Sequence, residues 1–300
     1  INECLLNNIT LLEIKNIIGN SKPPKNSNII HGSEVKLEKF DPKNKGDDTG
    51  YETLDQLTRW RKKELSVFTA STKAGKTTLL CNLLFKQLES CKPVLIGSFE
   101  LTLQEIQEKL FSIMMGVDYY NCFDDKLIEE FNKRISQIPI YFINHYGAID
   151  YNKFYSAIKY CVKYYDIEYL FIDHLQYVLP AQSQNMTQEI GVFMRNLKAL
   201  TNQFKIHTWI VVHPSAKANS ETEVSEFTLR GSAEIAQICD NVFIIKTDKE
   251  AQETTLELKL ARHPLARSGS ITLKFVSKFQ KYIIPEQKEK IVTERKDWNG

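Results

Sequence analysis

The sequence lacks the features that mark several specialised classes of protein. Its 300 residues carry 39 basic and 37 acidic side chains, a net charge of only +2, so any contact with a nucleic acid must come from local loops rather than a global basic field. The longest apolar runs have the length of a strand, so we expect no transmembrane span and no membrane partner. What is left is an ordinary globular composition, 42% hydrophobic and 25% charged, enough for one large α/β domain with an extension or for two modest domains.

Cysteine is present, but not in a pattern that indicates a metal site. No two of the six cysteines have the spacing of zinc ligands, and most fall on apolar faces of predicted helices, which favours free, buried thiols in a reducing compartment. The chain opens at Ile1 without a methionine, an apolar signal segment or an Arg/Ser-rich presequence. This opening is consistent with a piece excised from a longer protein.

One stretch organises the rest of the chain: an apolar strand at residues 65–70 that runs into a tight loop and then a helix. The loop has the spacing of a phosphate-binding loop, with Ala70 where the usual pattern has its first glycine. Backbone N–H groups of such a loop surround an anion, and the helix that starts near Gly75 points its positive end at the same anion. Lys76 is expected to reach the β- and γ-phosphates and the Thr77 hydroxyl to ligate Mg²⁺. The predicted nucleotide-binding residues are Ser71, Thr72, Lys73, Ala74, Gly75, Lys76, Thr77 and Thr78. A Ser/Thr-rich turn in an ordinary α/β domain is the alternative, and it leaves Gly-Lys-Thr-Thr at a helix start unexplained.

The pattern along the chain predicts four parts. Residues 1–18 hold an amphipathic helix, residues 19–48 a polar linker rich in Pro, Asn and Lys, residues 49–284 a core that contains the phosphate-binding loop, and residues 285–300 a charged tail. Strands that alternate with helices predict an α/β fold, with a mostly parallel central sheet flanked by helices and an antiparallel β extension at the C-terminal end. A helix separated from its core by a linker usually docks elsewhere; a cloning remnant or a helix packed in cis are the alternatives.

The predicted elements of the core follow from apolar periodicity and from capping residues. Thr102 and Glu105 predict a capping box, and Asp150 predicts another helix start. The predicted helices cover residues 75–90, 102–116, 124–137 and 150–165, then a helix that ends near 204, and 229–238. The predicted strands cover residues 93–100, 138–143, 169–173, 208–213, 241–246, 255–262 and 270–275.

Two carboxylates at predicted strand ends could take part in nucleotide hydrolysis. Asp173 ends an apolar strand of the kind buried on both faces, and the carboxyl ends of parallel strands face the ligand crevice. Asp173 is therefore expected to hold Mg²⁺ through water, although an aspartate that caps the next turn would look the same. Glu100 ends the strand after the P-loop helix; if that strand neighbours the P-loop strand, Glu100 could orient and deprotonate the attacking water.

Two further residues suit the phosphate end of such a site. His213 ends the strand at 208–213, where it could contact the γ-phosphate and transmit its loss to the following loop, although a lone histidine at a strand end is more often structural. Arg262, with Arg267 close behind, lies near a glycine-containing turn between the C-terminal strands. Arginine stabilises the charge of a transferring phosphoryl group, in cis or from a neighbouring subunit; two solvated hairpin arginines are the alternative.

In their order and spacing these motifs resemble the hexameric replicative helicases of the DnaB type, closest to the Twinkle branch and to the helicase half of phage primase-helicases. The resemblance covers roughly residues 50–275. Two motifs lie near the P-loop: residues 64–69, which precede it, and Gly97-Ser98-Phe99-Glu100, which matches the Twinkle segment that bears the catalytic glutamate. Residues 170–176 contain the family's Asp-x-Leu-Gln signature, and residues 211–214 contain the His-Pro pair of the Twinkle branch. Residues 229–233, with Gln237 and Asp240-Asn241, match the fourth helicase motif.

The resemblance implies a RecA-like core that works as a hexameric or heptameric ring. ATP and Mg²⁺ would lie between subunits, with Arg262 completing the neighbour's site, Phe275 stacking on the base and the N-terminal helix docking on the adjacent subunit. The ring would move 5′ to 3′ on single-stranded DNA and unwind the duplex, with a primase and a DNA polymerase as possible partners. A mitochondrion or plastid is favoured as its location over bacterial or phage-infected cytoplasm.

The same resemblance places the DNA contacts on loops that face a central channel, at residues 182–187, 214–227 and around 230–232. Such contacts with phosphate are independent of sequence and sensitive to salt. The candidate DNA-binding residues are Lys217, Arg230, Gly231 and Ser232.

The chain departs from the family pattern at two places, and other functions remain open. One is Ala70 in the P-loop. The other is Leu260-Ala261-Arg262, which lacks the lysine of the family's usual Lys-x-Arg; either the register is shifted and Lys259 serves instead, or one contact with the neighbouring subunit is missing. The alternatives are a RecA-type ATPase that does not unwind, such as a recombinase or loader, a P-loop small-molecule kinase, and a ring that binds nucleotide without hydrolysis. A kinase would carry an arginine-rich lid, and residues 182–187 contain no arginine.

Overall fold

The computed structural model describes residues 10–20, 45–71, 74–174, 186–212, 232–248 and 250–285, in two units. The first unit covers residues 1–44, and its described part is the helix α2 (Leu11–Asn20), capped where Glu13 accepts from the Thr10 backbone N–H at 2.8 Å. This helix includes Gly19 and Asn20, which we expected in the linker. The second unit begins at Lys45, four residues before the expected start of the core, because Asp47 pairs with Trp60.

A mixed sheet runs through the second unit in the order β3-β2-β4-β5-β1-β6-β7-β8-β9. The strands from β3 to β6 in this order are parallel, and β7, β8 and β9 are added antiparallel. The prediction of a mostly parallel sheet with a C-terminal antiparallel extension is therefore confirmed. The bounds are β1 (Leu65–Ala70), β2 (Val94–Ser98), β3 (Ile140–Phe142), β4 (Tyr169–Asp173), β5 (His207–Val212), β6 (Asn241–Asp248), β7 (Glu253–Ala261), β8 (Gly269–Val276) and β9 (Lys281–Ile283).

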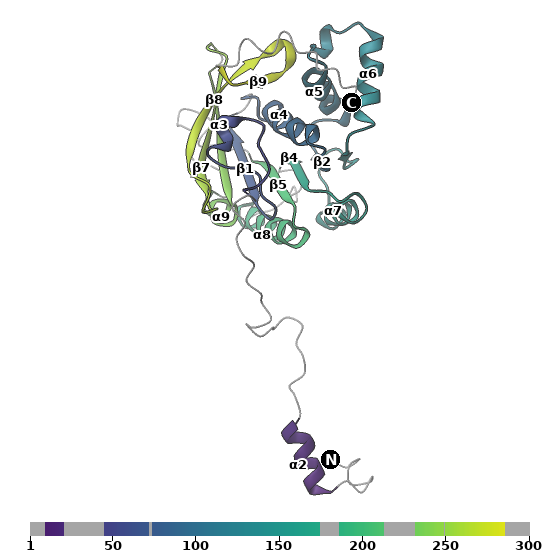
Figure 1. Cartoon of the computed structure of the whole chain (residues 1–300), viewed down its shortest axis with the longest axis vertical. Helices are drawn as coiled ribbons and strands as arrows, with labels where there is room; N and C mark the ends of the chain where they lie inside the picture. The colour runs from purple at the N-terminus through teal and green to yellow at the C-terminus, as the bar shows by residue number, and fades with distance from the viewer. Residues whose placement is uncertain are drawn as a thin grey trace. The chain divides into compact units, whose positions relative to one another are not determined.

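Helices cover both faces of the sheet (Figure 1), as a sheet with two apolar faces requires. One core packs the strands against α4, α5 and α6, and the other packs them against α7, α8 and α9. β4 serves both, because Phe171 joins the first core and Leu170 and Ile172 join the second. None of the helices in the described segments is long and apolar enough to cross a membrane. The bounds are α3 (Glu52–Asp55), α4 (Lys76–Glu89), α5 (Leu103–Met115), α6 (Asp125–Ile135), α7 (Tyr151–Tyr165), α8 (Met186–Phe204) and α9 (Ser232–Ile238), with 3₁₀ turns η2 (Tyr119–Asn121) and η6 (Ser277–Phe279).

The helix starts follow the capping chemistry of the sequence. Thr102 and Glu105 form the predicted capping box of α5, and the Asp150 side chain accepts hydrogen bonds from the first N–H groups of α7. β2 is shorter than predicted: it ends at Ser98, because the chain turns there and buries Phe99 completely. Glu100 therefore lies in the turn after β2 rather than in the strand.

Candidate nucleotide-binding site

In the loop between β1 and α4, the described residues are Ser71, Ala74 and Gly75. Gly75 caps α4 in the left-handed region, at φ 79°, and its carbonyl accepts the first bond of the helix from Leu79 N–H. The Lys76 ammonium donates to the carbonyl oxygens of Ala70 and Ser71, at 3.3 and 2.9 Å. Burial lowers the pKa of Lys76, while Glu100 and Asp173 act against that effect. Lys76 is thus a partly desolvated cation over the loop. Thr72 and Lys73 lie outside the described residues.

Thr77 and Asp173 meet below this loop with the chemistry of a divalent-cation site. The Thr77 hydroxyl donates to Asp173 Oδ2 at 3.0 Å, and Asp173 is fully buried at the end of β4. In the described part of the chain, Asp173 Oδ1 has no hydrogen-bond partner. Burial raises the pKa of Asp173 to about 6, although the Thr77 hydroxyl opposes the rise. A buried carboxylate oxygen without a partner beside a hydroxyl fits Mg²⁺, which prefers oxygen ligands.

The rest of the coordination sphere would have to come from phosphate and water. Across the described segments no three His, Cys, Asp or Glu side chains gather where they could hold a metal ion. Mg²⁺ that accompanies a nucleotide commonly uses one or two protein ligands and keeps the others for phosphate and water. The pair Thr77 and Asp173 is therefore suited to a nucleotide-bound Mg²⁺.

Glu100 lies near this site because the strand before it, β2, is the neighbour of β4. β2 does not neighbour β1; β4 and β5 lie between them, so the adjacency on which the role of Glu100 was made conditional is absent. β2 instead pairs with β4, which places Ser98 opposite Asp173 and brings Glu100 just beyond it. The Glu100 carboxylate lies 3.5 Å from Nε2 of His174, the residue after Asp173.

The C-terminal arginines are bound within their own chain. Arg262 donates to the carbonyls of Ala236, Gln237 and Cys239 at 2.7, 3.0 and 2.8 Å, where the cation stabilises the C-terminal end of α9. Arg267 donates to the Gln56 carbonyl at 3.2 Å. The role of either arginine in another subunit's site stays a prediction.

The other residues predicted from sequence are only partly described. Phe275 is half-buried and packs on Tyr282 with ring centroids 4.9 Å apart, so its contact with a base stays a prediction. Ser232 begins α9, but its side chain is outside the description. The predicted residues His213, Lys217, Arg230 and Gly231 all lie outside the described residues, as do most of the predicted DNA-binding loops.

The last strand braces the P-loop, which sequence reasoning missed. Asn82 on α4 donates to the Gln280 carbonyl at 2.9 Å and accepts from the Tyr282 N–H at 3.1 Å. Thr247 on β6 donates to the Ala74 carbonyl at 2.9 Å. A Cβ added to Gly75 would lie 2.6 Å from the Tyr282 hydroxyl. These contacts join residues far apart in the chain, so no local pattern could reveal them.

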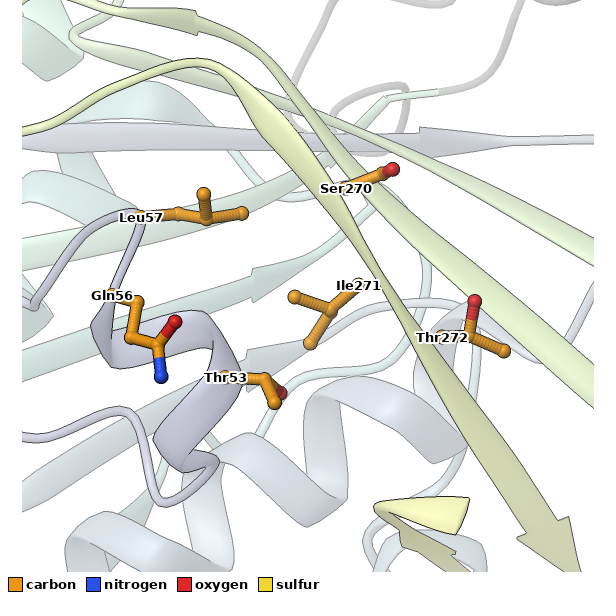
Figure 2. Close-up of a pocket in the computed structure, with 6 residues that line it drawn as sticks. All are labelled: Thr53, Gln56, Leu57, Ser270, Ile271 and Thr272. Carbon is orange, nitrogen blue, oxygen red and sulfur yellow. The ribbon is translucent and has the colours of Figure 1, made fainter. Parts of the chain in front are cut away.

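A pocket between α3 and β8 lies apart from this chemistry. Figure 2 shows the α3 side of the pocket facing the strand across a gap. No described residue of the P-loop lines it, and none of its lining side chains is charged. Its lining residues are Thr53, Gln56, Leu57, Ser270, Ile271 and Thr272.

Two solved structures share this fold. One is a separately solved ATPase domain, which superposes with a TM-score of 0.71 at 16% identity, over 79% of this chain and 90% of that one. The other is a DnaB-like replicative helicase, solved in a study of its interactions with primase, which superposes with a TM-score of 0.70 at 16% identity, over 94% of this chain and 66% of that one. At these identities the likeness concerns the fold.

Sequence comparison identifies the family. The replicative DNA helicase DnaB of Haemophilus influenzae is 24% identical over 290 residues, covering 87% of this chain and 62% of that protein. The DnaB of Mycoplasma pneumoniae is 26% identical over 274 residues, covering 81% of this chain and 57% of that protein. The chain thus spans about three-fifths of the length of these relatives. The model of the DnaB-like helicase C-terminal domain matches residues 46–283, and the chain belongs to that family.

Proposed function

We propose that the chain is the motor of a replicative DNA helicase, in which ATP hydrolysis drives 5′ to 3′ movement on single-stranded DNA and separation of the duplex. The observation that carries the proposal is that Lys76 and Thr77, at the start of α4, meet Asp173 and Glu100, which lie at the carboxyl ends of the adjacent strands β4 and β2. Family membership supports nucleotide binding and hydrolysis. Translocation and unwinding are the finer steps proposed here.

Each residue has a separate role in hydrolysis. Lys76 exchanges the carbonyls of Ala70 and Ser71 for phosphate oxygens, to which a desolvated ammonium binds more strongly. Thr77 and Asp173 would hold Mg²⁺, which supplies positive charge to the β- and γ-phosphate oxygens. Glu100 orients the attacking water and takes its proton.

The active form is proposed to be a ring of identical subunits. Arg262 or Arg267 of one copy would complete the site of the next, and His213 would sense the γ-phosphate. The described Arg262 must then leave the carbonyls of α9, which other donors or water would have to satisfy. Helix α2 is proposed to dock on the neighbouring subunit, and primase and polymerase are possible partners.

The DNA contacts and the branch of the family are proposed from the motifs. Lys217, Arg230, Gly231 and Ser232 would contact phosphates in the channel of the ring. Glu100 within Gly-Ser-Phe-Glu and the His213-Pro214 pair favour the Twinkle and phage primase-helicase branch.

Replacement of Lys76 tests the assignment of the site. Lys76→Ala is expected to lower the turnover of ATP about 100-fold or more, because one preorganised charge on the reacting phosphates is removed. Turnover is measured by phosphate release with saturating ATP and Mg²⁺, with the melting temperature as a check on folding. Lys86→Ala is the matched control, because Lys86 lies on the same helix, 40% exposed, and pairs with Glu89. Wild-type turnover in Lys76→Ala would refute the assignment.

A further inference from the structure

We propose that His174 is a positioning residue for Glu100: its imidazole donates a hydrogen bond from Nε2 to one carboxylate oxygen and leaves the other aimed at the attacking water. The inference rests on the proposed function, since it assigns a second residue to the step that Glu100 carries out. His174 is the neighbour of Asp173 but faces the other carboxylate of the site.

The pairing of β2 with β4 brings the two residues together. Ser98 is paired with Asp173 in the parallel ladder, and the Phe99 N–H donates to the Asp173 carbonyl at 2.7 Å. His174 is therefore the first residue beyond the paired end of β4, and Glu100 is the second residue beyond the paired end of β2. Their side chains meet with Nε2 3.5 Å from Oε2.

The backbone under Glu100 is already fixed, so the remaining freedom belongs to its side chain. Phe99 is fully buried, and its carbonyl accepts from Gly147 N–H at 3.1 Å. The Ser98 hydroxyl donates to the Leu101 carbonyl at 3.0 Å across the turn. A glutamate side chain has many rotamers, so a group that holds its carboxylate contributes to the geometry of the reaction.

His174 is suited to this task because it cannot move far. Its side chain is 3% exposed, whereas that of Glu100 is 45% exposed. Among the ion pairs of the described residues, His174 is the partner of the Glu100 carboxylate. A 3.5 Å separation is long for a hydrogen bond, and such bonds often shorten once substrate is bound.

The proposed role of His174 also bears on a competing partner of Glu100, the Lys76 ammonium. Glu100 and Lys76 attract each other, as the upward effect of Glu100 on the pKa of Lys76 indicates. A carboxylate drawn onto the Lys76 ammonium would neither reach water nor leave that ammonium free for phosphate. In the proposed arrangement, a hydrogen bond from His174 to Glu100 would oppose this collapse.

The test compares two replacements of His174 in the full-length protein. His174→Leu, which removes the donor, is expected to lower kcat at least about 10-fold, with KM for ATP and affinity for a non-hydrolysable ATP analogue within about twofold of wild type. His174→Gln keeps an N–H donor and is expected to recover much of kcat. His207→Gln is the control, because His207 is also buried but contacts the Ser66 hydroxyl and the Arg61 carbonyl instead of Glu100. This variant should have a lower melting temperature than the wild type but should not show the loss of kcat.

A double-mutant cycle separates positioning from a structural role. If His174 acts through Glu100, then Glu100→Gln with His174→Leu is no slower than Glu100→Gln alone. Additive losses, equal losses in His174→Gln and His174→Leu, or full kcat in His174→Leu would each overturn the inference. If the wild-type protein has no ATP turnover, the proposed function fails as well; if it is active and His174→Leu is equally active, the inference alone fails.

Discussion

At the scale of the residue, Gly75 is required for two independent reasons. Its φ of 79° lies in the left-handed region, and a Cβ there would meet the Tyr282 hydroxyl at 2.6 Å. Only the first reason is visible in the sequence, as a motif glycine at a helix start. The second depends on a strand from the opposite end of the chain.

Replacement of Gly75 should therefore cost more than replacement of a comparable glycine. Gly75→Ala is expected to lower the free energy of unfolding by more than the about 1–2 kcal/mol of left-handed strain, and to weaken ATP binding. Gly116→Ala is the control, because Gly116 also has a positive φ of 66° but nothing within 4 Å of an added Cβ. Urea unfolding and ATP titration give both quantities. Adding Tyr282→Phe should relieve the clash in Gly75→Ala; equal losses in the two glycine variants would contradict this account.

A buried histidine makes stability depend on pH. Burial lowers the pKa of His207 to about 3, although the Arg61 carbonyl acts against this effect. A histidine in the unfolded chain has a pKa near 6.5. Below that pH, His207 therefore binds a proton in the unfolded chain but stays neutral in the folded chain. The contribution of His207 to stability is full above pH 6.5 and is lost as the pH falls toward 3, by about 2 kcal/mol between pH 6.5 and pH 5.

Urea unfolding at pH 7 and pH 5 measures this contribution. The difference between wild type and His207→Gln isolates it, because all other groups titrate in both proteins. The wild type should lose about 2 kcal/mol more than the variant on acidification. The same pH dependence in both proteins would show that His207 is not the group responsible.

At the scale of the element, the local sequence predicts where helices start, but it does not predict which strands pair. The Thr102–Glu105 box and the Asp150 cap are predictable because each joins residues a few positions apart. The order of the strands in the sheet is not predictable in this way, because it depends on contacts across the whole domain. The sequence therefore offers Glu100 as a candidate but leaves open which strands lie beside its own, and the folded sheet places β2 between β3 and β4.

Helix α2 offers a prediction at the same scale. Leu11 and Leu12 are 71% and 70% exposed, which suits a helix that buries its apolar face on another subunit. Leu11→Ser with Leu12→Ser is expected to weaken assembly by about 10-fold or more, because each buried leucine contributes about 1.5–3 kcal/mol. Analytical ultracentrifugation over a range of concentrations measures it. Lys15→Ser with Asn16→Ser, at exposed positions of the same helix, is the control. Unchanged assembly in the leucine variant would contradict docking by α2.

At the scale of the whole molecule, the candidate site combines motifs that are recognisable in the sequence with contacts that are not predictable from it. Lys76, Thr77 and Asp173 are predictable, because a phosphate-binding loop and an apolar strand ending in a carboxylate are local patterns. The contact of His174 with Glu100 and the hydrogen bonds of Asn82 on α4 with Gln280 and Tyr282 could not be predicted, because they need the folded sheet. The part of the site proposed for a neighbouring copy rests on the motifs alone.

The measurement that tests the central claim most directly is strand separation by the full-length protein. With ATP and Mg²⁺ it is offered a forked duplex with single-stranded arms, and ATP turnover is followed in the same reaction. The account predicts turnover stimulated by the single strand together with unwinding, and loss of both in Lys76→Ala. Stimulated turnover with an intact duplex would contradict it and would indicate a RecA-type ATPase that does not unwind.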